Sequence, residues 1–336
     1  MDLESEVAIV VPAYMPSEKN TIGKTLRYLR DNVRGVVKGN LYLVWNNNSS
    51  ENFSSLVAQL GSYAQTLEVK GSKSKAENLN KFISLYRHQY KYILIYDADA
   101  RPSCTSVQQL YNTMRSIGDT YAFVQGNFQF SRGNQSFTRG YDTLEHTLYN
   151  IWVGGTVNRP SILGHDVIIS TDALYKVDGF DPDYLLEDAE LTSSLYTAGY
   201  KGYFLGGHRS SSESAATFYD LVRQRYRWTA GRYQLNPGVI VFKTILAIIW
   251  IALYVFFPWQ TIIYGFILGL VLFKFNIGVA FLFLWYPLMV LIITGYFVIH
   301  GIPKGFCATP RDDQLAGKVD QVALNHSSKF AQRRIL

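Results

Sequence analysis

Charge almost disappears from the chain between Val239 and Ile302, and this feature constrains the fold more than any other. Only Lys243 and Lys274 are charged in this stretch. Its length of about 64 residues is enough for two or three membrane passes at roughly 20 residues each. Breaks at 257–260 and 274–276 predict helices over 239–257, 260–274 and 277–300.

A helical hairpin buried in a soluble domain is the alternative explanation. Long helices of soluble proteins normally carry a polar stripe, which these segments lack, so membrane helices are favoured. The middle segment is short for a span, and a tilted, re-entrant or interfacial helix is expected there. Composition thus divides the chain into a soluble domain over 1–236, a membrane region over 237–302 and a polar, basic tail over 303–336.

The remaining composition limits the partners and the compartment. A formal net charge of +6 is compatible with binding nucleic acid, anionic lipid headgroups or phosphorylated substrates. The apolar segments favour the last two, and no nucleic-acid partner is predicted. Cys104 and Cys307 are the only cysteines and support neither a disulfide framework nor a thiolate zinc site. The N-terminal stretch MDLESEVAIVVPAY lacks the features of a signal peptide, so we expect a cytosolic domain.

Strand-like and helix-like patterns alternate through the first hundred residues. Short apolar runs at 7–11, stopped by Pro12, and at 41–45 predict buried strands. Apolar residues at helical spacing between Asn20 and Arg34 predict a helix between them. Because strand–helix–strand units form parallel sheets, the predicted fold class is α/β. The pattern continues with a helix over 53–64, a strand over 66–70, a helix over 75–88 and a strand over 92–96.

Two carboxylates, Asp97 and Asp99, follow the strand at 92–96 directly. Open α/β sheets place ligands at the carboxyl ends of their strands, where both side chains can face one ligand. Mg²⁺ and Mn²⁺ take oxygen ligands and commonly share carboxylates with a diphosphate. The stretch therefore predicts a divalent cation site, with a solvated turn as the alternative.

A second acidic pair, Glu187 and Asp188, precedes the helix-like run AELTSSLYTAG, in which Gly199 is the expected stop. A carboxylate near a helix N-terminus can take a proton from a hydroxyl if it stays ionised and within hydrogen-bond reach. The alternative is a charge that only stabilises the helix terminus.

Just before the apolar region, Gln224, Arg227 and Trp228 form the pattern QxxRW. At helical spacing Gln224 shares one face with the other two residues. Arginine supplies planar donors for phosphate oxygens, and tryptophan supplies a broad apolar face for a sugar ring. A positively charged anchor beside a membrane helix is the alternative explanation.

Several stretches in one order make the chain similar to a known family. They are VVPAYMP ending at Pro16, SKAENLN at 74–80, DAD at 97–99, LLED at 185–188 and QRYRW at 224–228, followed by Gly231. The chain resembles family 2 inverting glycosyltransferases, and more narrowly the branch that contains cellulose, chitin and hyaluronan synthases. The likeness covers about residues 7 to 231 and continues into the membrane region, and QxxRW is its most specific element.

The resemblance implies a GT-A, Rossmann-like nucleotide-sugar domain and a set of site residues. Asp188 would be the catalytic base, and Asp97 and Asp99 would hold Mg²⁺ or Mn²⁺. Residues matching the donor and diphosphate site are Lys75, Asn80, Asp97, Gln224 and Arg227. Residues matching the acceptor site are Glu187, Trp228 and Phe128, the last within Phe128-Gln129-Phe130.

The chain departs from the family pattern in three places. Where the family commonly has aspartates near the uracil, this chain has Asn46 and Asn47, which we take as candidates for contact with the base. Glu77 stands where the family often has glycine, which changes the expected loop. The chain also shows no N-terminal membrane helix and few C-terminal ones, so a secretion channel built from it would be narrow or incomplete.

The function implied by the resemblance is transfer of a hexose from a UDP-sugar to a β-linked polysaccharide or oligosaccharide by a metal-dependent enzyme. The enzyme would be an integral membrane protein with its catalytic domain facing the cytosol, and an oligomer is compatible with this interpretation. A lipid acceptor, as in enzymes similar to ceramide glucosyltransferase, is the first alternative. An inactive membrane scaffold is the second.

Overall fold

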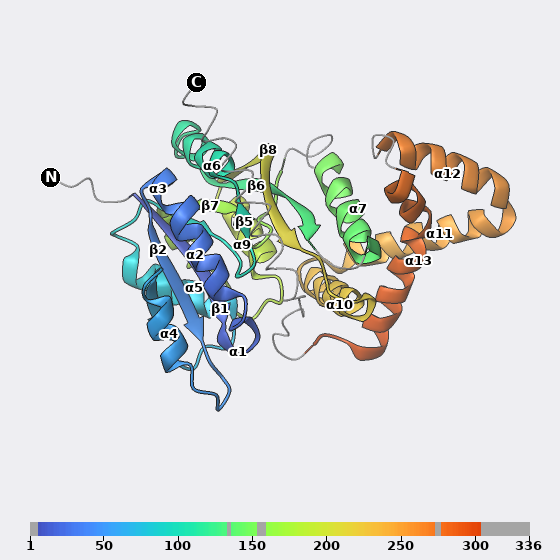
Figure 1. Cartoon of the computed structure of the whole chain (residues 1–336). Coiled ribbons are helices and arrows are strands. Elements are labelled where there is room, and N and C mark those ends of the chain that lie inside the picture. The colour runs from blue at the N-terminus through green and yellow to red at the C-terminus, as the bar shows by residue number, and fades with distance from the viewer. Residues whose placement is uncertain (1–5, 133–135, 153–158, 273–276, 304–336) are drawn as a thin grey trace, which may run out of the picture.

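One mixed sheet forms the centre of the computed structural model, which describes residues 6–132, 136–152, 159–272 and 277–303 (Figure 1). Its eight strands lie in the order β3-β2-β1-β4-β7-β6-β8-β5. Helices cover the sheet, and the C-terminal helices extend away from it on one side (Figure 1). The architecture is therefore α/β, as the sequence predicts.

The first half of the sheet is parallel. Strands β1 (Val7–Tyr14), β2 (Asn40–Asn46), β3 (Gln65–Glu68) and β4 (Tyr92–Ile95) pair in parallel. The helices between them are α1 (Met15–Glu18), α2 (Ile22–Asn32), α3 (Arg34–Val37), α4 (Ser54–Leu60) and α5 (Lys75–Tyr86). The predicted strand–helix alternation of this half is confirmed.

Strand β1 continues through Pro12, so the prediction that proline stops it is wrong. Its pairing with β4 ends at Val10, whose carbonyl accepts the Tyr96 N–H at 3.1 Å. Pro12 faces the same side of the strand as Val10, but it lies beyond the last residue that pairs with β4. Its missing N–H therefore removes no hydrogen bond between the two strands. On the other side β1 pairs with β2 as far as Tyr14.

The second half of the sheet is mixed, and the sequence predicted no strand direction for it. Strand β7 (Val167–Ser170) runs antiparallel to both β4 and β6 (Tyr121–Arg132). Strand β8 (Lys201–Glu213) pairs in parallel with β6, and β5 (Arg101–Pro102) lies antiparallel on its edge. The helices of this half are α6 (Cys104–Ser116), α8 (Thr171–Lys176) and α9 (Glu187–Thr197).

Two apolar cores lie on opposite faces of the sheet. Along β1, Ile9 and Val11 pack into one core and Ala8 and Val10 into the other, and all four are fully buried. This alternation follows from the two-residue period of a strand. The first core is completed by α2 and the second by α5.

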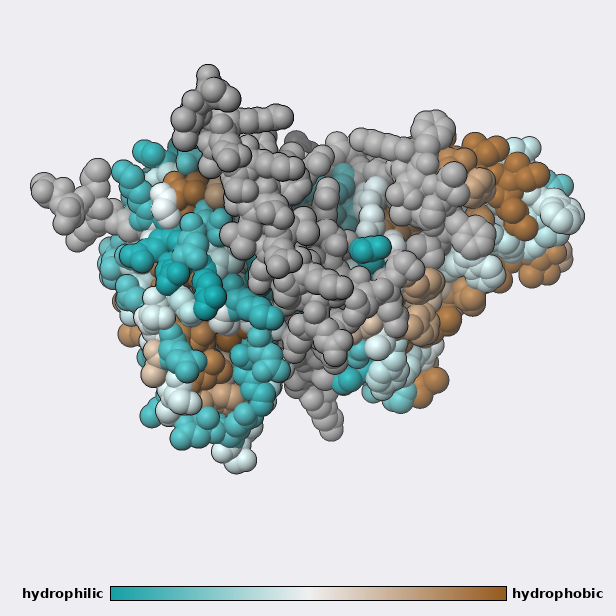
Figure 2. All heavy atoms as spheres, viewed as in Figure 1, coloured by the Kyte–Doolittle hydropathy of each residue, from teal (hydrophilic) through white to brown (hydrophobic). Residues whose placement is uncertain are grey.

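The C-terminal helices are α10 (Phe218–Leu235), α11 (Pro237–Phe256), α12 (Pro258–Leu272) and α13 (Ile277–His300). Helices α11, α12 and α13 agree closely with the three predicted apolar helices. Among the residues that the structure describes, two helical stretches are long and apolar enough to cross a membrane, Pro237–Phe256 and Phe283–His300, while α12 is shorter. Figure 2 shows the apolar surface gathered over these helices. Of the predicted tail, residues 304–336 lie outside the described residues.

A third apolar cluster joins this region to the rest of the chain. It contains Tyr141 and Leu144 of α7 (Ser136–Trp152), Leu221 of α10, and Met289 and Ile293 of α13. Helix α13 therefore packs on α7 and α10 as well as on its apolar neighbours.

Candidate active site

The acidic turn after β4 is held by hydrogen bonds from β8 and from α2. Asp99 is 6% exposed, and its carboxylate accepts the Glu213 N–H at 3.2 Å. The Ala98 carbonyl accepts the hydroxyl of Thr25 on α2. Asp97 remains partly exposed, so the turn presents one open and one largely enclosed carboxylate at the end of the strand.

Lys75 lies at the first position of α5 and reaches this turn. Its ammonium is 2.6 Å from Asp97 Oδ1 and donates to the Gly164 carbonyl at 2.7 Å. Burial alone would lower the pKa of Lys75, but the charges of Asp97, Glu187 and Asp188 outweigh it and raise that pKa. Lys75 is therefore a stable cation between the two acidic pairs.

The start of α5 explains the departure at Glu77. Ser74 caps the helix by accepting the Glu77 N–H at 3.1 Å, and the Glu77 carboxylate accepts the Lys73 N–H. This is close to the reciprocal capping pattern that fixes helix N-termini. A charged residue thus holds the loop that delivers Lys75.

Glu187 and Asp188 occupy the first turn of α9, as predicted. Asp188 Oδ1 accepts the Ala189 N–H at 2.8 Å, and both carboxylates are partly enclosed. Burial raises the pKa of both groups, and each is opposed by the cation of Lys75. Gly164 makes room for this arrangement, because a β-carbon there would lie 3.1 Å from Asp188 Oδ2.

Helix α10, which carries the QxxRW residues, packs against the loop before α9. Burial and the charge of Asp188 raise the pKa of Glu187, and the positive charges of Lys75 and Arg227 oppose that rise. The helix approaches closely because Gly231 lies against Leu186, where a β-carbon would be 2.6 Å from the leucine Cγ. Gln234 Oε1 also accepts the Leu185 N–H at 3.1 Å.

The other two residues of the pattern share a neighbour. Gln224 is 8% exposed, and its amide oxygen accepts a hydrogen bond from Arg225. The Trp228 ring lies 4.1 Å from the Arg225 guanidinium, measured to the ring centroid. Thus α10 presents Arg227 to the acidic pair, while Gln224 and Trp228 are organised around Arg225.

Three of the predicted site residues use their amides inside the protein. Asn80 binds the Phe180 backbone through both ends of its side chain, at 2.6 and 2.8 Å. Asn46 is 3% exposed and donates to the Ser72 carbonyl at 2.8 Å. Asn47 donates to the Glu51 carbonyl at 2.7 Å and accepts from Ser49. Each of these amides holds a loop, and their assignment to donor or base binding stays a prediction.

Phe128 lies between two histidines that the sequence did not bring to notice. Its ring centroid is 4.4 Å from that of His146 and 4.3 Å from that of His165. Phe128 is 7% exposed, so its ring is largely buried between them. Its predicted contact with an acceptor stays a prediction.

His165 is a further residue that sequence reasoning missed and that the acidic turn affects electrostatically. Its Nδ1 lies 3.2 Å from Asp166 Oδ2. Burial would lower the pKa of His165, but Asp166, Asp97 and Asp99 together outweigh it and raise that pKa. Asp166 has φ of 53°, an uncommon backbone for a non-glycine residue, of the kind that clusters at functional sites. The sequence signal was the polar triplet Gly164-His165-Asp166 between two apolar runs.

The acidic turn offers oxygen ligands that fit a hard divalent cation. Within the described ranges, no group of three or more His, Cys, Asp or Glu side chains is arranged to hold a metal ion. The chain would therefore supply Asp97 and Asp99, and a bound diphosphate and water would supply the rest. Mg²⁺ is commonly held in this way, through one or two carboxylates and substrate phosphates.

Comparisons with known proteins found similar solved structures. One solved structure is the mannosyltransferase PcManGT from Pyrobaculum calidifontis in complex with GDP-Man and Mn²⁺. It is 14% identical, with a TM-score of 0.50, over 96% of this chain and 80% of that one. A second is glucosyl-3-phosphoglycerate synthase from Mycobacterium tuberculosis in complex with Mn²⁺, UDP and phosphoglyceric acid. It is 16% identical, with a TM-score of 0.48, over 68% and 78% of the two chains.

The first of these likenesses shows a shared mixed α/β fold of the GT-A type. No curated protein matches the chain. The model of the family described as glycosyl transferase family group 2 matches residues 92–299. This match spans β4, the acidic turn, the Glu187–Asp188 pair, the QxxRW helix and most of the apolar region. Because it covers more than half of the chain, the protein belongs to glycosyl transferase family group 2.

Proposed function

We propose that the chain is a membrane-attached, metal-dependent inverting hexosyltransferase of the branch that resembles cellulose, chitin and hyaluronan synthases. Its donor is a UDP-sugar, and its acceptor is a growing β-linked polysaccharide or oligosaccharide. One observation carries the proposal. Lys75 contacts Asp97 and interacts electrostatically with Glu187 and Asp188, so motifs about 90 residues apart in sequence meet at one cation.

The basic residues are suited to the departing diphosphate. Lys75 supplies a compact charge beside the acidic turn, and Arg227 supplies a planar set of donors from α10. A divalent cation bound by Asp97 and Asp99 would screen the remaining phosphate charge. Donor binding then requires the Lys75 ammonium to share or leave its contact with Asp97.

Asp188 is suited to the acceptor side of the reaction. Its carboxylate takes the proton of an acceptor hydroxyl, and the hydroxyl oxygen forms a bond to the anomeric carbon of the donor sugar. The bond from that carbon to the phosphate oxygen breaks, and its electron pair leaves with UDP. Attack from the face opposite the leaving group turns an α-linked donor into a β-linked product.

Membrane attachment through α11 and α13 supports a cytosolic site at the bilayer surface. Both contain stretches long and apolar enough to cross a membrane, and α10, which carries QxxRW, leads directly into α11. An integral membrane protein with its catalytic domain facing the cytosol follows from this proposal.

A panel of nucleotide sugars tests the function. Membranes that contain the chain are incubated with UDP-sugars and, because one similar structure holds GDP-Man, with GDP-sugars as well. Release of UDP that depends on the acceptor and on the metal is expected. Release of GDP alone would correct the donor, and release at background from every donor would favour an inactive scaffold.

A lipid acceptor is a second candidate. Among the described residues two helical stretches are long enough to span a bilayer, which is few for a channel that surrounds a polymer. Radiolabelled product that partitions into organic solvent would select the lipid acceptor. Product that stays water-soluble or forms an insoluble polymer would select the saccharide.

A further inference from the structure

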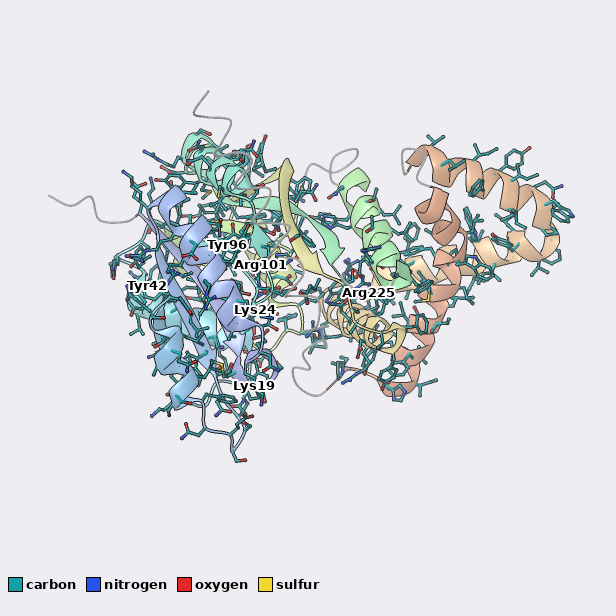
Figure 3. All side chains as sticks on the ribbon, viewed as in Figure 1. Lys19, Lys24, Tyr42, Tyr96, Arg101 and Arg225 are labelled. Atoms are coloured by element: carbon teal, nitrogen blue, oxygen red, sulfur yellow. The ribbon has the colours of Figure 1, made fainter. Side chains whose placement is uncertain are left out.

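Arg225, the second residue of QRYRW, is buried between α10 and α7 (Figure 3). It is 3% exposed. On the α7 side its guanidinium forms ion pairs with Asp142 through Nη2 and with Glu145 through Nε. On its own helix, Nη1 donates to Gln224 Oε1, and the guanidinium lies 4.1 Å from the Trp228 ring centroid.

These contacts use the shape of the guanidinium. Two nitrogens face carboxylates of α7, a third holds the Gln224 amide, and the planar group faces the Trp228 ring. Lysine has a single compact ammonium and reproduces neither the fork nor the plane. Gln224 and Trp228 share one face of α10 because they are four residues apart, and Arg225 touches both.

Burying such a cluster is costly unless every charge is paired. Apolar residues of similar volume are often as stabilising as a buried ion pair. The stability of the fold therefore does not by itself require an arginine at position 225. An apolar residue there could not donate the hydrogen bond that holds the Gln224 amide. The cluster also connects to the apolar region, since Tyr141 of α7 stacks on Tyr286 of α13 at 5.9 Å.

We infer that Arg225 is a positioning residue, which holds the Gln224 amide and the Trp228 ring against the site from carboxylates on α7. Arg225 itself contacts neither donor nor acceptor. The inference extends the proposed function by making α7 the support for the QxxRW wall.

The first test separates positioning from stability. Arg225→Met leaves Asp142 buried without its partner, so both the unfolding midpoint and the transfer rate should fall. The triple variant Asp142→Asn/Glu145→Gln/Arg225→Met removes the three charges and keeps the side-chain sizes. Its midpoint should recover toward that of the wild type, while kcat stays about tenfold to a hundredfold low, the range for a misplaced site wall. UDP affinity should fall as well in both variants, because the Gln224 amide that Arg225 holds belongs to the proposed donor and diphosphate site.

Arg223→Met is the matched control, because Arg223 lies on the same helix and is partly exposed, with its guanidinium 5.7 Å from the Tyr219 ring centroid. Its kcat should stay near that of the wild type. Recovery of kcat together with the midpoint in the triple variant would overturn the inference, since the cluster would then serve stability alone.

A second readout does not depend on transfer. The fluorescence of Trp228 is obtained by subtracting the Trp228→Phe variant from each parent protein, and acrylamide quenching of that component is measured. Quenching should increase when Arg225 is replaced, because the ring loses the group that covers it. Unchanged quenching in a folded Arg225→Met protein would contradict the inference. Increased quenching in a protein that transfers no sugar would uphold positioning and count against the proposed function.

Discussion

At the level of single residues, Lys75 joins two acidic groups that lie far apart in the sequence. It pairs directly with Asp97 and lowers the pKa of both Glu187 and Asp188 against the larger effect of burial. Two predictions follow for the acidic pair of α9, one for its role and one for its ionisation.

Asp188→Asn should abolish transfer while leaving UDP affinity nearly intact, because a base is needed only when the acceptor hydroxyl loses its proton. A loss of roughly 10² to 10⁴ in kcat is the range for a positioned base. Steady-state kinetics and UDP binding on membranes check this. Glu190→Gln is the control, since Glu190 is also in the first turn of α9 but bonds to Ser194. An equal loss of kcat in Asp188→Asn and Glu190→Gln would mean that Asp188 only stabilises the N-terminus of the helix.

Transfer should fall on the acid side at a higher pH than an ordinary aspartate allows. The base must be ionised, and its raised pKa means that the carboxylate is lost earlier as pH falls. The acid limb of kcat/KM should therefore lie above the ordinary value of about 3.9. An acid limb near pH 3.9 in the wild type would contradict this prediction. Because Glu187 and Asp188 are neighbours, the apparent pKa of the limb describes the two groups together.

Residue types and spacing identified the carboxylates and QxxRW but not the groups that support them. Thr25 and His165 carry no motif, because each acts through contacts with residues far away in sequence, Thr25 with Ala98 and His165 with Asp166 and the acidic turn. The asparagines were visible as residue types. Their use in holding loops depends on backbone positions that the sequence does not display.

At the level of elements, the site depends on how closely α10 approaches the loop before α9. Gly231 and Leu186 set that approach, since an added β-carbon at Gly231 would lie 2.6 Å from the Leu186 Cγ. Helix α10 was predictable from its pattern, whereas this contact was not.

Gly231→Ala should lower kcat by about tenfold to a hundredfold, because the new methyl group displaces Leu186 and with it the adjoining acidic pair. Overpacking of this kind also costs roughly 1–3 kcal/mol of stability. The added variant Leu186→Ala should restore much of the rate by making room. Gly295→Ala on α13, where a β-carbon meets no atom within 4 Å, is the control. If Leu186→Ala does not restore transfer, the loss of rate in Gly231→Ala does not come from the contact with Leu186.

The position and direction of β7 in the sheet could not be predicted from the sequence. Alternating patterns gave the parallel half, because each of those strands is followed by a helix that crosses back. Strand β7 has only four residues and enters between β4 and β6 in the opposite direction. Its neighbours are set by tertiary contacts, which a short apolar run does not specify.

At the level of the whole molecule, the acidic turn, the acidic pair and the QxxRW helix act together only if a cation completes the donor site. Asp97 and Asp99 supply part of its coordination, and the donor would supply the remainder.

Excess EDTA should stop transfer, and added Mn²⁺ or Mg²⁺ should restore it, because the diphosphate would otherwise face the carboxylates of the turn unscreened. In Asp99→Asn the metal concentration that gives half-maximal rate should rise by more than roughly 10- to 100-fold. That range is typical when only a residue hydrogen-bonded to a metal ligand is lost, whereas Asp99 would be a ligand itself. Titration of metal against rate measures this. Full turnover in EDTA would remove the metal from the proposal.

The packing of α7 against α13 has a consequence for how the protein is made. The stacked rings of Tyr141 and Tyr286 are separated by about 145 residues of chain, which a ribosome adds in roughly 7 to 30 s at usual rates. Through that interval α7 has emerged while the helix that covers it does not yet exist. The support for the QxxRW wall thus reaches its final packing only after the apolar helices have been synthesised. A nascent chain released early would hold the acidic residues but not the finished site, so sugar transfer is expected to begin only when α13 has been synthesised and packed on α7.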